Sequence, residues 1–346
     1  MMKGRKRMGK IRIGQIGAMH DHAGELIQTF QKMTDVYELV GLAIPEGETM
    51  LGNAAGEHVY DGVPRMSVEE MLNRDDLDAI AIETSELNLT KYAMMAVKKG
   101  LPVHMDKPGG IELKDFEALI AEVQKQGTLF HTGYMYRYNP AVQKLKKEIE
   151  EGKLGGIYCV EAHMDCGHSP AKRQWLDQFP GGMMFFLGCH LVDMICYLQG
   201  FPKEVIPYNC STGFDGVTAD DYGFAVLKYD NGVSFAKTCA NELGGFMRRQ
   251  LVVCGEKGTV QLLPFEAPPD EGARTALVTG VRECFNRAGG WFYKGDQYQT
   301  EPFDRYIPMM KAFASYVRKE AVNPFSPDYE LEVYRTVLKA CGKSGR

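Results

Sequence analysis

The sequence has no Cys-x-x-Cys motif, although it contains nine cysteines. They are odd in number and scattered from Cys159 to Cys341. Such a pattern predicts neither a disulfide framework nor a zinc ribbon. We therefore expect a reducing, cytoplasmic setting.

The sequence also lacks a sustained basic stripe beyond its first ten residues, and its net charge is −5. These features argue against nucleic acid or an anionic membrane as partner. Residues 1–10 are basic but no apolar segment follows them, so neither a signal peptide nor a membrane anchor is predicted. There is no internal repeat. What remains is a globular chain of 346 residues, 45% of them hydrophobic, which suits two domains.

The first part of the chain alternates strand and helix patterns. The apolar run at 10–16 leads to Gly17 and a helical pattern over 22–30, the opening of a nucleotide-binding unit. Further strands are predicted at 37–44, 78–84, 101–105 and 128–133, with helices at 90–99 and 115–126. Ser67 followed by Glu70 predicts a capping box at another helix start. This alternation predicts an α/β Rossmann domain over residues 1–133, with a doubly wound parallel sheet.

After residue 133 the regular alternation of predicted strands and helices ends. A helix at 141–151 leads to predicted strands at 157–164, 222–229, 232–239 and 250–254, with an Asn-Gly hairpin signal at Asn231. Helices are predicted at 188–198, 303–319 and 330–341. Residues 134–346 are thus predicted to form an α+β domain with a largely antiparallel open sheet. Its C-terminal helices are free to pack back on the first domain.

The segment 101–110 carries the predicted chemistry of the first domain. A short apolar strand ends in Asp106, Lys107 and Pro108, followed by two glycines. Open α/β sheets bind their ligands at such strand ends. Proline restricts the residue before it, so Lys107 is expected to be held by its backbone.

Several motifs occur in an order that resembles the Gfo/Idh/MocA family of nicotinamide-dependent sugar and polyol oxidoreductases. They are Asp106-Lys107-Pro108, where the family has Glu-Lys-Pro; 133–140 with Tyr136 and Arg137; 152–155; Gly181-Gly182; and 188–193 with His190 and Asp193. The resemblance covers nearly the whole chain. It implies an NAD(P)-dependent dehydrogenase that acts on a secondary hydroxyl of a sugar, cyclitol or glycoside, and that forms a homo-oligomer.

The first turn departs from the family. Its glycine fingerprint is reduced here to Gly17, followed by Ala18, Met19, His20 and Asp21. The resemblance places cofactor contacts at Gly17, Met19, His20, His22, Ile44, Glu46, Thr84, Asp106, Lys107 and Pro108. The two histidines could hold a phosphate or cap and pack the turn, and both readings stay open. No Lys or Arg closely follows Ile44 to meet a 2′-phosphate, so NAD is favoured over NADP.

Lys107 and His190 are the predicted catalytic residues. Oxidation of an alcohol needs a base on the hydroxyl, and His190 with Asp193 three residues later on one helix face suits that role. The family has an aspartate four residues before this histidine, whereas this chain has Phe186. Asp165 and Asp177 are candidates to replace that carboxylate.

The predicted substrate contacts are Lys107, Tyr136, Arg137, His163, Asp165, His168, Trp175, Asp177, His190 and Asp193. No metal is predicted, but His163, Asp165, His168 and His190 form an alternative metal set. Three functions therefore stay open: a dehydrogenase, an NAD- or metal-assisted enzyme for glycoside cleavage or elimination, and a sugar-binding protein without catalysis.

Overall fold

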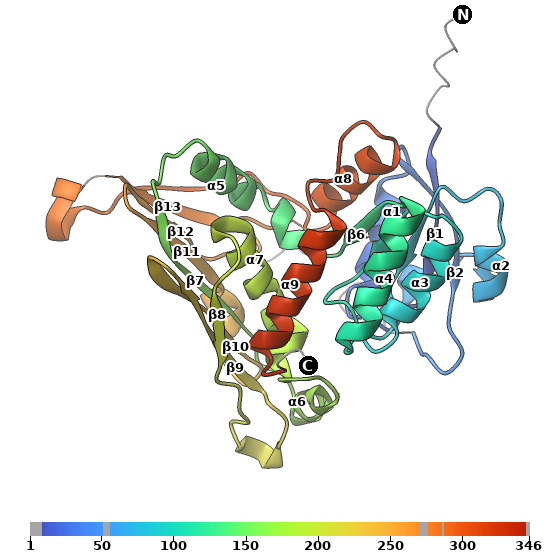
Figure 1. Ribbon diagram of the computed structural model, residues 1–346, viewed down its shortest axis with the longest axis horizontal. Coiled ribbons are helices and arrows are strands. Elements are labelled where there is room, and N and C mark those ends of the chain that lie inside the picture. Colours follow the sequence, from blue (N-terminus) through green and yellow to red (C-terminus); the bar gives the residue numbers. More distant parts are fainter. Residues whose placement is uncertain (1–8, 51–55, 270–275, 286, 344–346) are drawn as a thin grey trace, which may run out of the picture. The chain divides into compact units, whose positions relative to one another are not determined.

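The computed structural model describes residues 9–50, 56–269, 276–285 and 287–343, which fall into two compact units (Figure 1). The first unit comprises Met1–Gly133 and Tyr306–Leu331, and the second comprises Tyr134–Arg305 and Glu332–Arg346. The first unit is thus built from two separate stretches of chain. Among the described helices, none is long and apolar enough to cross a membrane.

The first unit contains a six-stranded parallel sheet of order β3-β2-β1-β4-β5-β6. The strands are β1 (Ile11–Ile16), β2 (Tyr37–Ala43), β3 (Arg65–Met66), β4 (Ala79–Ile82), β5 (Val103–Met105) and β6 (Phe130–Thr132). Ile13, Leu42 and Ile80 are fully buried, as expected for strands covered on both faces. The predicted doubly wound parallel sheet is confirmed.

Five helices accompany this sheet: α1 (Ala23–Lys32), α2 (Val68–Leu72), α3 (Leu89–Lys98), α4 (Leu113–Gln126) and α8 (Ile307–Val317). The predicted capping box is present, because Ser67 accepts from the Glu70 N–H and the Glu70 carboxylate accepts from the Ser67 N–H. α4 ends at Gly127, which adopts the left-handed conformation that favours glycine.

α8 comes from the C-terminal part of the chain and packs into the core of the first unit. Phe313 is fully buried, with its ring 5.3 Å from that of His131. The Tyr37 hydroxyl donates to the Met310 carbonyl at 2.7 Å. The predicted helix at 303–319 is observed as α8 and belongs to the first unit, the alternative that the sequence left open.

The second unit contains an eight-stranded sheet of order β14-β13-β12-β11-β7-β10-β9-β8. The strands are β7 (Ile157–Asp165), β8 (Glu204–Pro207), β9 (Tyr222–Tyr229), β10 (Gly232–Cys239), β11 (Gln250–Gly255), β12 (Thr259–Leu262), β13 (Gly280–Cys284) and β14 (Asp296–Gln299). Only the β7–β10 pair of this sheet is parallel, so the predicted, largely antiparallel sheet is confirmed.

The helices of this unit are α5 (Pro140–Glu150), α6 (Pro170–Trp175) and α7 (Cys189–Gln199), with α9 (Pro327–Ala340) shared between the two units. α7 packs on β7 and β10. The β9–β10 hairpin lies where the sequence places it, with the predicted strand bounds. Gly232 pairs with Tyr229, so the turn residues are Asp230 and Asn231.

Candidate functional site

The carboxyl ends of β1, β4 and β5 bring the predicted residues of the first unit together, because parallel strands end at one edge. Gly17 follows β1 with φ 93°, a left-handed conformation. A Cβ at Gly17 would lie 2.3 Å from the Thr84 nitrogen after β4. This glycine therefore allows the first turn to pack on the neighbouring strand end.

The backbone of the first turn is largely bonded within the protein. The N–H groups of Met19 and His20 both donate to the Glu83 carbonyl at 3.2 Å. The Gly17 N–H donates to the Ala43 carbonyl at 2.8 Å. These N–H groups already donate to carbonyls at the ends of β2 and β4. A bound diphosphate would therefore have to accept hydrogen bonds from N–H groups at the N-terminus of α1, which begins at Ala23.

His20 lies at the centre of this turn and is fully buried. Its Nε2 lies 3.2 Å from the Lys107 carbonyl, and its Nδ1 accepts from the His22 N–H at 3.2 Å. Burial lowers the pKa of His20 to about 3, so its imidazole is neutral at physiological pH.

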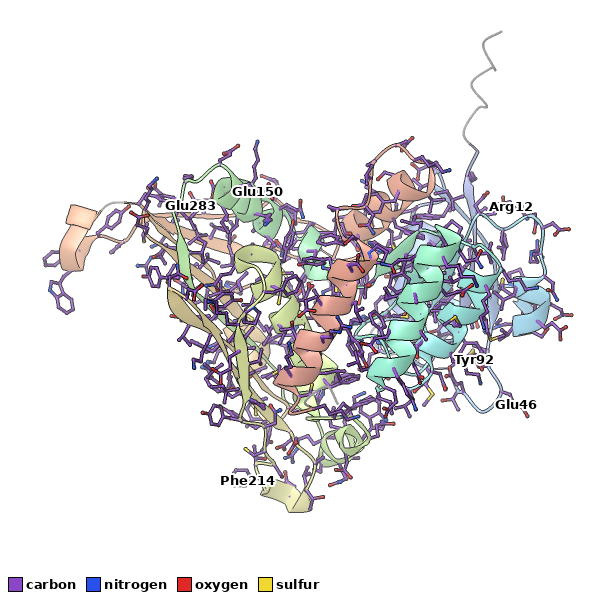
Figure 2. The ribbon with its side chains drawn as sticks, in the orientation of Figure 1. Arg12, Glu46, Tyr92, Glu150, Phe214 and Glu283 are labelled. Carbon is purple, nitrogen blue, oxygen red and sulfur yellow. The ribbon has the colours of Figure 1, made fainter. Side chains whose placement is uncertain are left out.

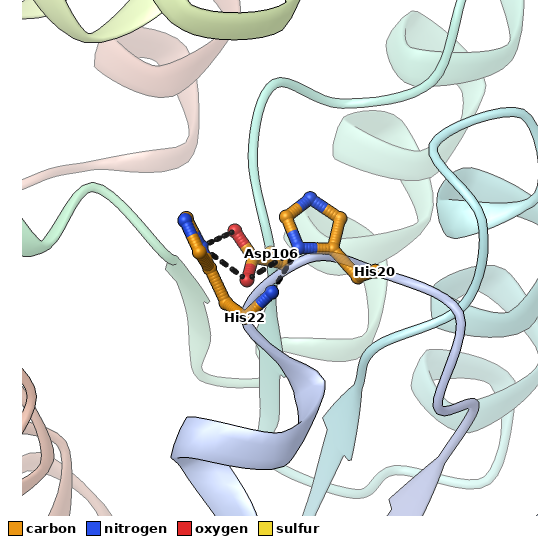
Figure 3. Close-up of side chains that lie close together, drawn as sticks. All are labelled: His20, His22 and Asp106. Atoms are coloured by element: carbon orange, nitrogen blue, oxygen red, sulfur yellow. Dashed lines mark hydrogen bonds and ion pairs between the residues drawn. The ribbon is translucent and has the colours of Figure 1, made fainter. Parts of the chain in front are cut away.

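The Asp106 carboxylate meets both imidazoles (Figure 3). Its Oδ2 lies 3.1 Å from Nδ1 of His20 and 3.0 Å from Nδ1 of His22. Burial opposes ionisation of Asp106, but the two imidazoles and the charge of Lys107 hold its pKa well below the usual range. Burial, reinforced by the Asp106 charge, raises the pKa of Glu83 well above the usual range. Burial and charge thus shift the pKa values of these two neighbouring carboxyls in opposite directions.

Lys107 is 2% exposed and is the second residue after β5. Its backbone N–H donates to Asp106 Oδ1 at 2.6 Å, and the peptide bond to the buried Pro108 is cis. The residue is therefore held by its backbone, and its side chain lies within the protein at the sheet edge.

The loop after β2 contains the residues predicted to meet a ribose. Ile44 packs on the apolar cluster around Ala18 and Leu42. Glu46 is exposed on this loop (Figure 2). Glu48 Oε1 instead accepts from the Asn88 side chain at 2.7 Å, which ties the loop to the start of α3.

In the second unit, His190 lies in α7 directly after a π-helical turn, Met184–Gly188. Such turns are frequent at functional sites. His190 is 1% exposed, and its ring meets the Tyr136 ring edge-on at 4.9 Å and the Tyr134 ring at 5.8 Å. The two tyrosines therefore fix the plane of the imidazole.

Asp193, predicted to orient His190, is paired with Arg137 instead. Arg137 donates from Nε at 2.9 Å and from Nη2 at 2.6 Å to Asp193 Oδ1, and both side chains are 1% exposed. This ion pair joins the turn before α5 to α7. Both residues thus serve to position α7.

Glu266 is a carboxylate that the sequence analysis did not single out. It is linked to His190 through Tyr136, whose ring contacts the imidazole. The Tyr136 hydroxyl donates to Glu266 Oε1 at 2.8 Å, and Arg249 and Arg305 also donate to this oxygen. Although burial opposes it, the two guanidinium groups lower the pKa of Glu266. Glu266 lies outside the predicted strands and helices, and no motif marks it.

The alternative metal ligands in the second unit, His163, Asp165, His168 and His190, do not form a metal-binding group among the described residues. In the residues that the structure describes, three His, Cys, Asp or Glu donor atoms come within 4.8 Å of one another only at His20, His22 and Asp106. Asp165 pairs with Lys237 at 2.9 Å, and the His163 ring meets Phe235 at 5.5 Å. The His168 N–H donates to the Ala240 carbonyl in a neighbouring turn.

Asp165 and Asp177 are the residues predicted to replace the family aspartate, whose position Phe186 occupies. Asp177 is exposed, whereas Phe186 belongs to an aromatic group with Trp175 and Phe179. The Lys172 ammonium lies 3.6 Å from the centre of the Trp175 ring. Trp175 is partly exposed, so an aromatic face with a cation is present in this loop.

Two family models match the chain. Residues 11–134 match the model described as "Oxidoreductase family, NAD-binding Rossmann fold", and residues 142–261 match "GFO/IDH/MocA C-terminal domain". The chain belongs to the Gfo/Idh/MocA family. As a member of this family it is a nicotinamide-dependent oxidoreductase, which confirms the prediction from its motifs at that level.

Individual relatives are distant. The chain is 25% identical to bovine trans-1,2-dihydrobenzene-1,2-diol dehydrogenase over 64% of its length and 72% of that enzyme. It is 22% identical to the Bacillus subtilis scyllo-inositol 2-dehydrogenase (NADP(+)) IolW over 66% of its length, and spans 63% of that enzyme. A 3-ketoreductase from Actinomadura kijaniata, solved with TDP-benzene and NADP, matches with a TM-score of 0.71 at 16% identity, covering 95% of this chain and 96% of the other.

Proposed function

We propose that this oxidoreductase uses NAD to oxidise a secondary ring hydroxyl of a sugar, cyclitol or glycoside. The observation that carries the proposal is the buried Lys107 at the carboxyl end of β5, on the sheet edge where this fold binds dinucleotides. The relatives named above act, by their names, on a cyclic diol and an inositol, both of which are secondary ring alcohols.

The residues at the sheet edge fit a dinucleotide in part. Gly17 has the left-handed conformation and α1 begins just beyond it, whereas Met19 replaces the second glycine. We propose that Gly17, the N-terminus of α1, Thr84 and the segment 106–108 hold the cofactor. When bound, the nicotinamide supplies the acceptor for hydride.

We assign the two remaining tasks to this chain's own side chains. His190 takes the hydroxyl proton, and the Tyr134 and Tyr136 rings hold its imidazole in one plane. The Lys107 ammonium stabilises the negative charge that develops on the substrate oxygen. Trp175 and Lys172 offer a stacking face and a cation that suit a sugar ring.

The preference for NAD rests on the loop after β2. This loop carries Glu46 and Glu48, and residues 44–56 contain neither Lys nor Arg. Carboxylates repel a 2′-phosphate and suit the free ribose hydroxyl of NAD. From the cysteine pattern we further propose a cytoplasmic setting, and by resemblance to the family we propose a homo-oligomer.

The test combines dinucleotide binding with turnover. Purified protein is titrated with NADH and NADPH while the nicotinamide fluorescence is followed, and NADH formation is then measured with a panel of inositols, aldoses and glycosides. We expect NADH to bind more tightly than NADPH and at least one cyclic polyol to give net NADH. Cleavage of a glycoside without net NADH would favour redox-assisted cleavage, and sugar binding without dinucleotide binding would favour a sugar-binding protein.

A further inference from the structure

We propose that His20, His22 and Asp106 form a binding site for a divalent first-row transition cation such as Zn²⁺. Their donor atoms all lie within 4.8 Å of one another. Asp106 Oδ2 lies 3.1 Å from Nδ1 of His20 and 3.0 Å from Nδ1 of His22 (Figure 3). Tetrahedral ligand bonds of about 2.1 Å bring neighbouring donor atoms about 3.4 Å apart. The two contacts of Asp106 lie within a few tenths of an ångström of that spacing.

The hydrogen bonds of His20 leave its Nδ1 without a proton. Its Nε2 faces the Lys107 carbonyl, which can only accept, so Nε2 carries the ring proton. Its Nδ1 accepts from the His22 N–H with its one lone pair. Asp106 Oδ2 lies 3.1 Å from the same Nδ1. A cation that replaces the His22 N–H at this lone pair would be close enough to bind Asp106 as well.

The contact between His20 and the Lys107 carbonyl has a second consequence. Histidine ligands usually donate their other ring N–H to a carbonyl or carboxylate, which fixes the tautomer and the direction of the ligating nitrogen. His20 has this arrangement before any ion binds. The ring is fully buried, so it is also held in place by packing.

Carboxyl groups lie close to the cluster. Glu83 lies 3.9 Å from Nδ1 of His20, and Glu86 lies 3.9 Å from its Nε2. The Asp106 carboxylate favours a cation beside His20, and the Lys107 ammonium opposes it. Two imidazoles and one carboxylate are a donor set typical of Zn²⁺ and Fe²⁺.

The proposed site is open on one side. His22 is the only one of the three side chains with appreciable exposure, at 16%, against 0% for His20 and 4% for Asp106. Three protein ligands leave a coordination position for water or for an oxygen of a bound molecule. That position would be reached from the side of His22.

The proposed site shares Asp106 with the segment assigned to the cofactor, so its test measures the metal in the absence of dinucleotide. The full-length protein is stripped with a chelator, dialysed against Zn²⁺ or Co²⁺ and analysed for bound metal, and the visible spectrum of the Co²⁺ form is recorded. We expect one ion per chain, with Co²⁺ bands that report nitrogen and oxygen ligands. His22→Gln and Asp106→Asn should each weaken binding at least about tenfold, since even loss of an outer-shell partner has an effect of that size.

The matched control is His58→Gln, because the His58 side chain is 98% exposed and lies outside the cluster. This variant should bind metal like the parent. Circular dichroism verifies folding, and the partly exposed His22 keeps the test valid if Asp106→Asn unfolds. A parent that binds no ion, or equal binding in the parent and folded His22→Gln, would overturn the proposal. Metal binding without any NADH binding would refute the proposed function and leave the metal site standing.

Discussion

Lys107 is held in place by the residues on either side of it and by one glycine far along the chain. Asp106 Oδ1 accepts its backbone N–H, and a Cβ at Gly133 would lie 2.9 Å from the same oxygen. Gly133 therefore leaves the space that the Asp106 carboxylate occupies. The position of the lysine thus depends on β6 as well as β5.

The assigned catalytic roles predict large losses of turnover. Lys107→Met keeps the length of a buried side chain and removes its charge, and His190→Asn removes the base. We expect each variant to lower kcat/KM by about 10²–10⁴-fold, the usual contribution of such groups. Steady-state kinetics with the best polyol measure this loss. Lys114→Met, on the exposed face of α4, is the control, and unchanged kcat/KM in either variant would remove that residue from its role.

The buried histidines of the first unit predict how stability changes with pH. Burial lowers the pKa of His104 to about 4 and that of His20 to about 3. Below the unfolded pKa of about 6.5, the unfolded chain binds protons that the folded chain does not, so stability falls with decreasing pH. Each site contributes a slope of about 1.4 kcal/mol per pH unit between pH 6 and 5.

Urea unfolding of metal-free protein between pH 5 and 7 measures this slope. His104→Gln should reduce the slope by about one site's contribution. The same substitution at the exposed His58 should leave it unchanged. Equal slopes in the parent and in folded His104→Gln would contradict the prediction.

At the scale of residues, the sequence identified members of the candidate site but not their contacts with one another. It singled out His20, His22 and Asp106 as cofactor residues, and the structure joins them across 84 positions of the chain. That contact depends on β1 and β5 both lying next to β4, a strand order that local patterns do not specify. Glu266 was missed for a related reason, because its partner Tyr136 lies 130 positions away.

At the scale of elements, a buried ion pair helps to hold α7 in the second unit, in addition to its packing on β7 and β10. Arg137 and Asp193 are each 1% exposed, and the pair links the 3₁₀ turn Met135–Tyr138 to α7. Removing one partner leaves the other charge buried without compensation. The ion pair therefore contributes to the placement of His190, three residues before Asp193.

Arg137→Met should destabilise the protein by about 3–5 kcal/mol, because it strands the Asp193 carboxylate. The double variant Arg137→Met/Asp193→Leu should recover much of this loss. Lys203→Met, which breaks the exposed pair with Asp230, is the control and should change stability by less than about 1 kcal/mol. Urea unfolding measures all three variants, and a single variant as stable as the double would contradict the prediction.

The sequence located elements well where they are long or buried and poorly where they are short and exposed. The apolar runs of β1, β2 and β4 and the alternation in β9 and β10 were sufficient to place those strands. β14 is exposed at all four positions and β3 is only two residues long, so neither has a hydrophobic period. Tertiary pairing, not local pattern, defines such edge strands.

At the scale of the whole molecule, the first unit is not a continuous segment. α8 returns to it from the C-terminal part of the chain, and Phe313 packs on His104 and His131. Phe313→Ala should therefore destabilise the Rossmann unit by about 3–5 kcal/mol. Calorimetry should show the loss, while Val322→Ala, at an 89% exposed position, should have little effect. An unchanged transition in Phe313→Ala would contradict this assignment.

This interleaving limits how the protein can be recombined with its relatives. A graft that exchanges only residues 1–133 would leave the Tyr37 hydroxyl and the His131 ring against a foreign α8. Chimaeras intended to swap cofactor preference should transplant residues 306–331 along with the N-terminal stretch. A single crossover after residue 133 divides the first unit, so designs with three crossovers, after residues 133, 305 and 331, should yield more folded hybrids.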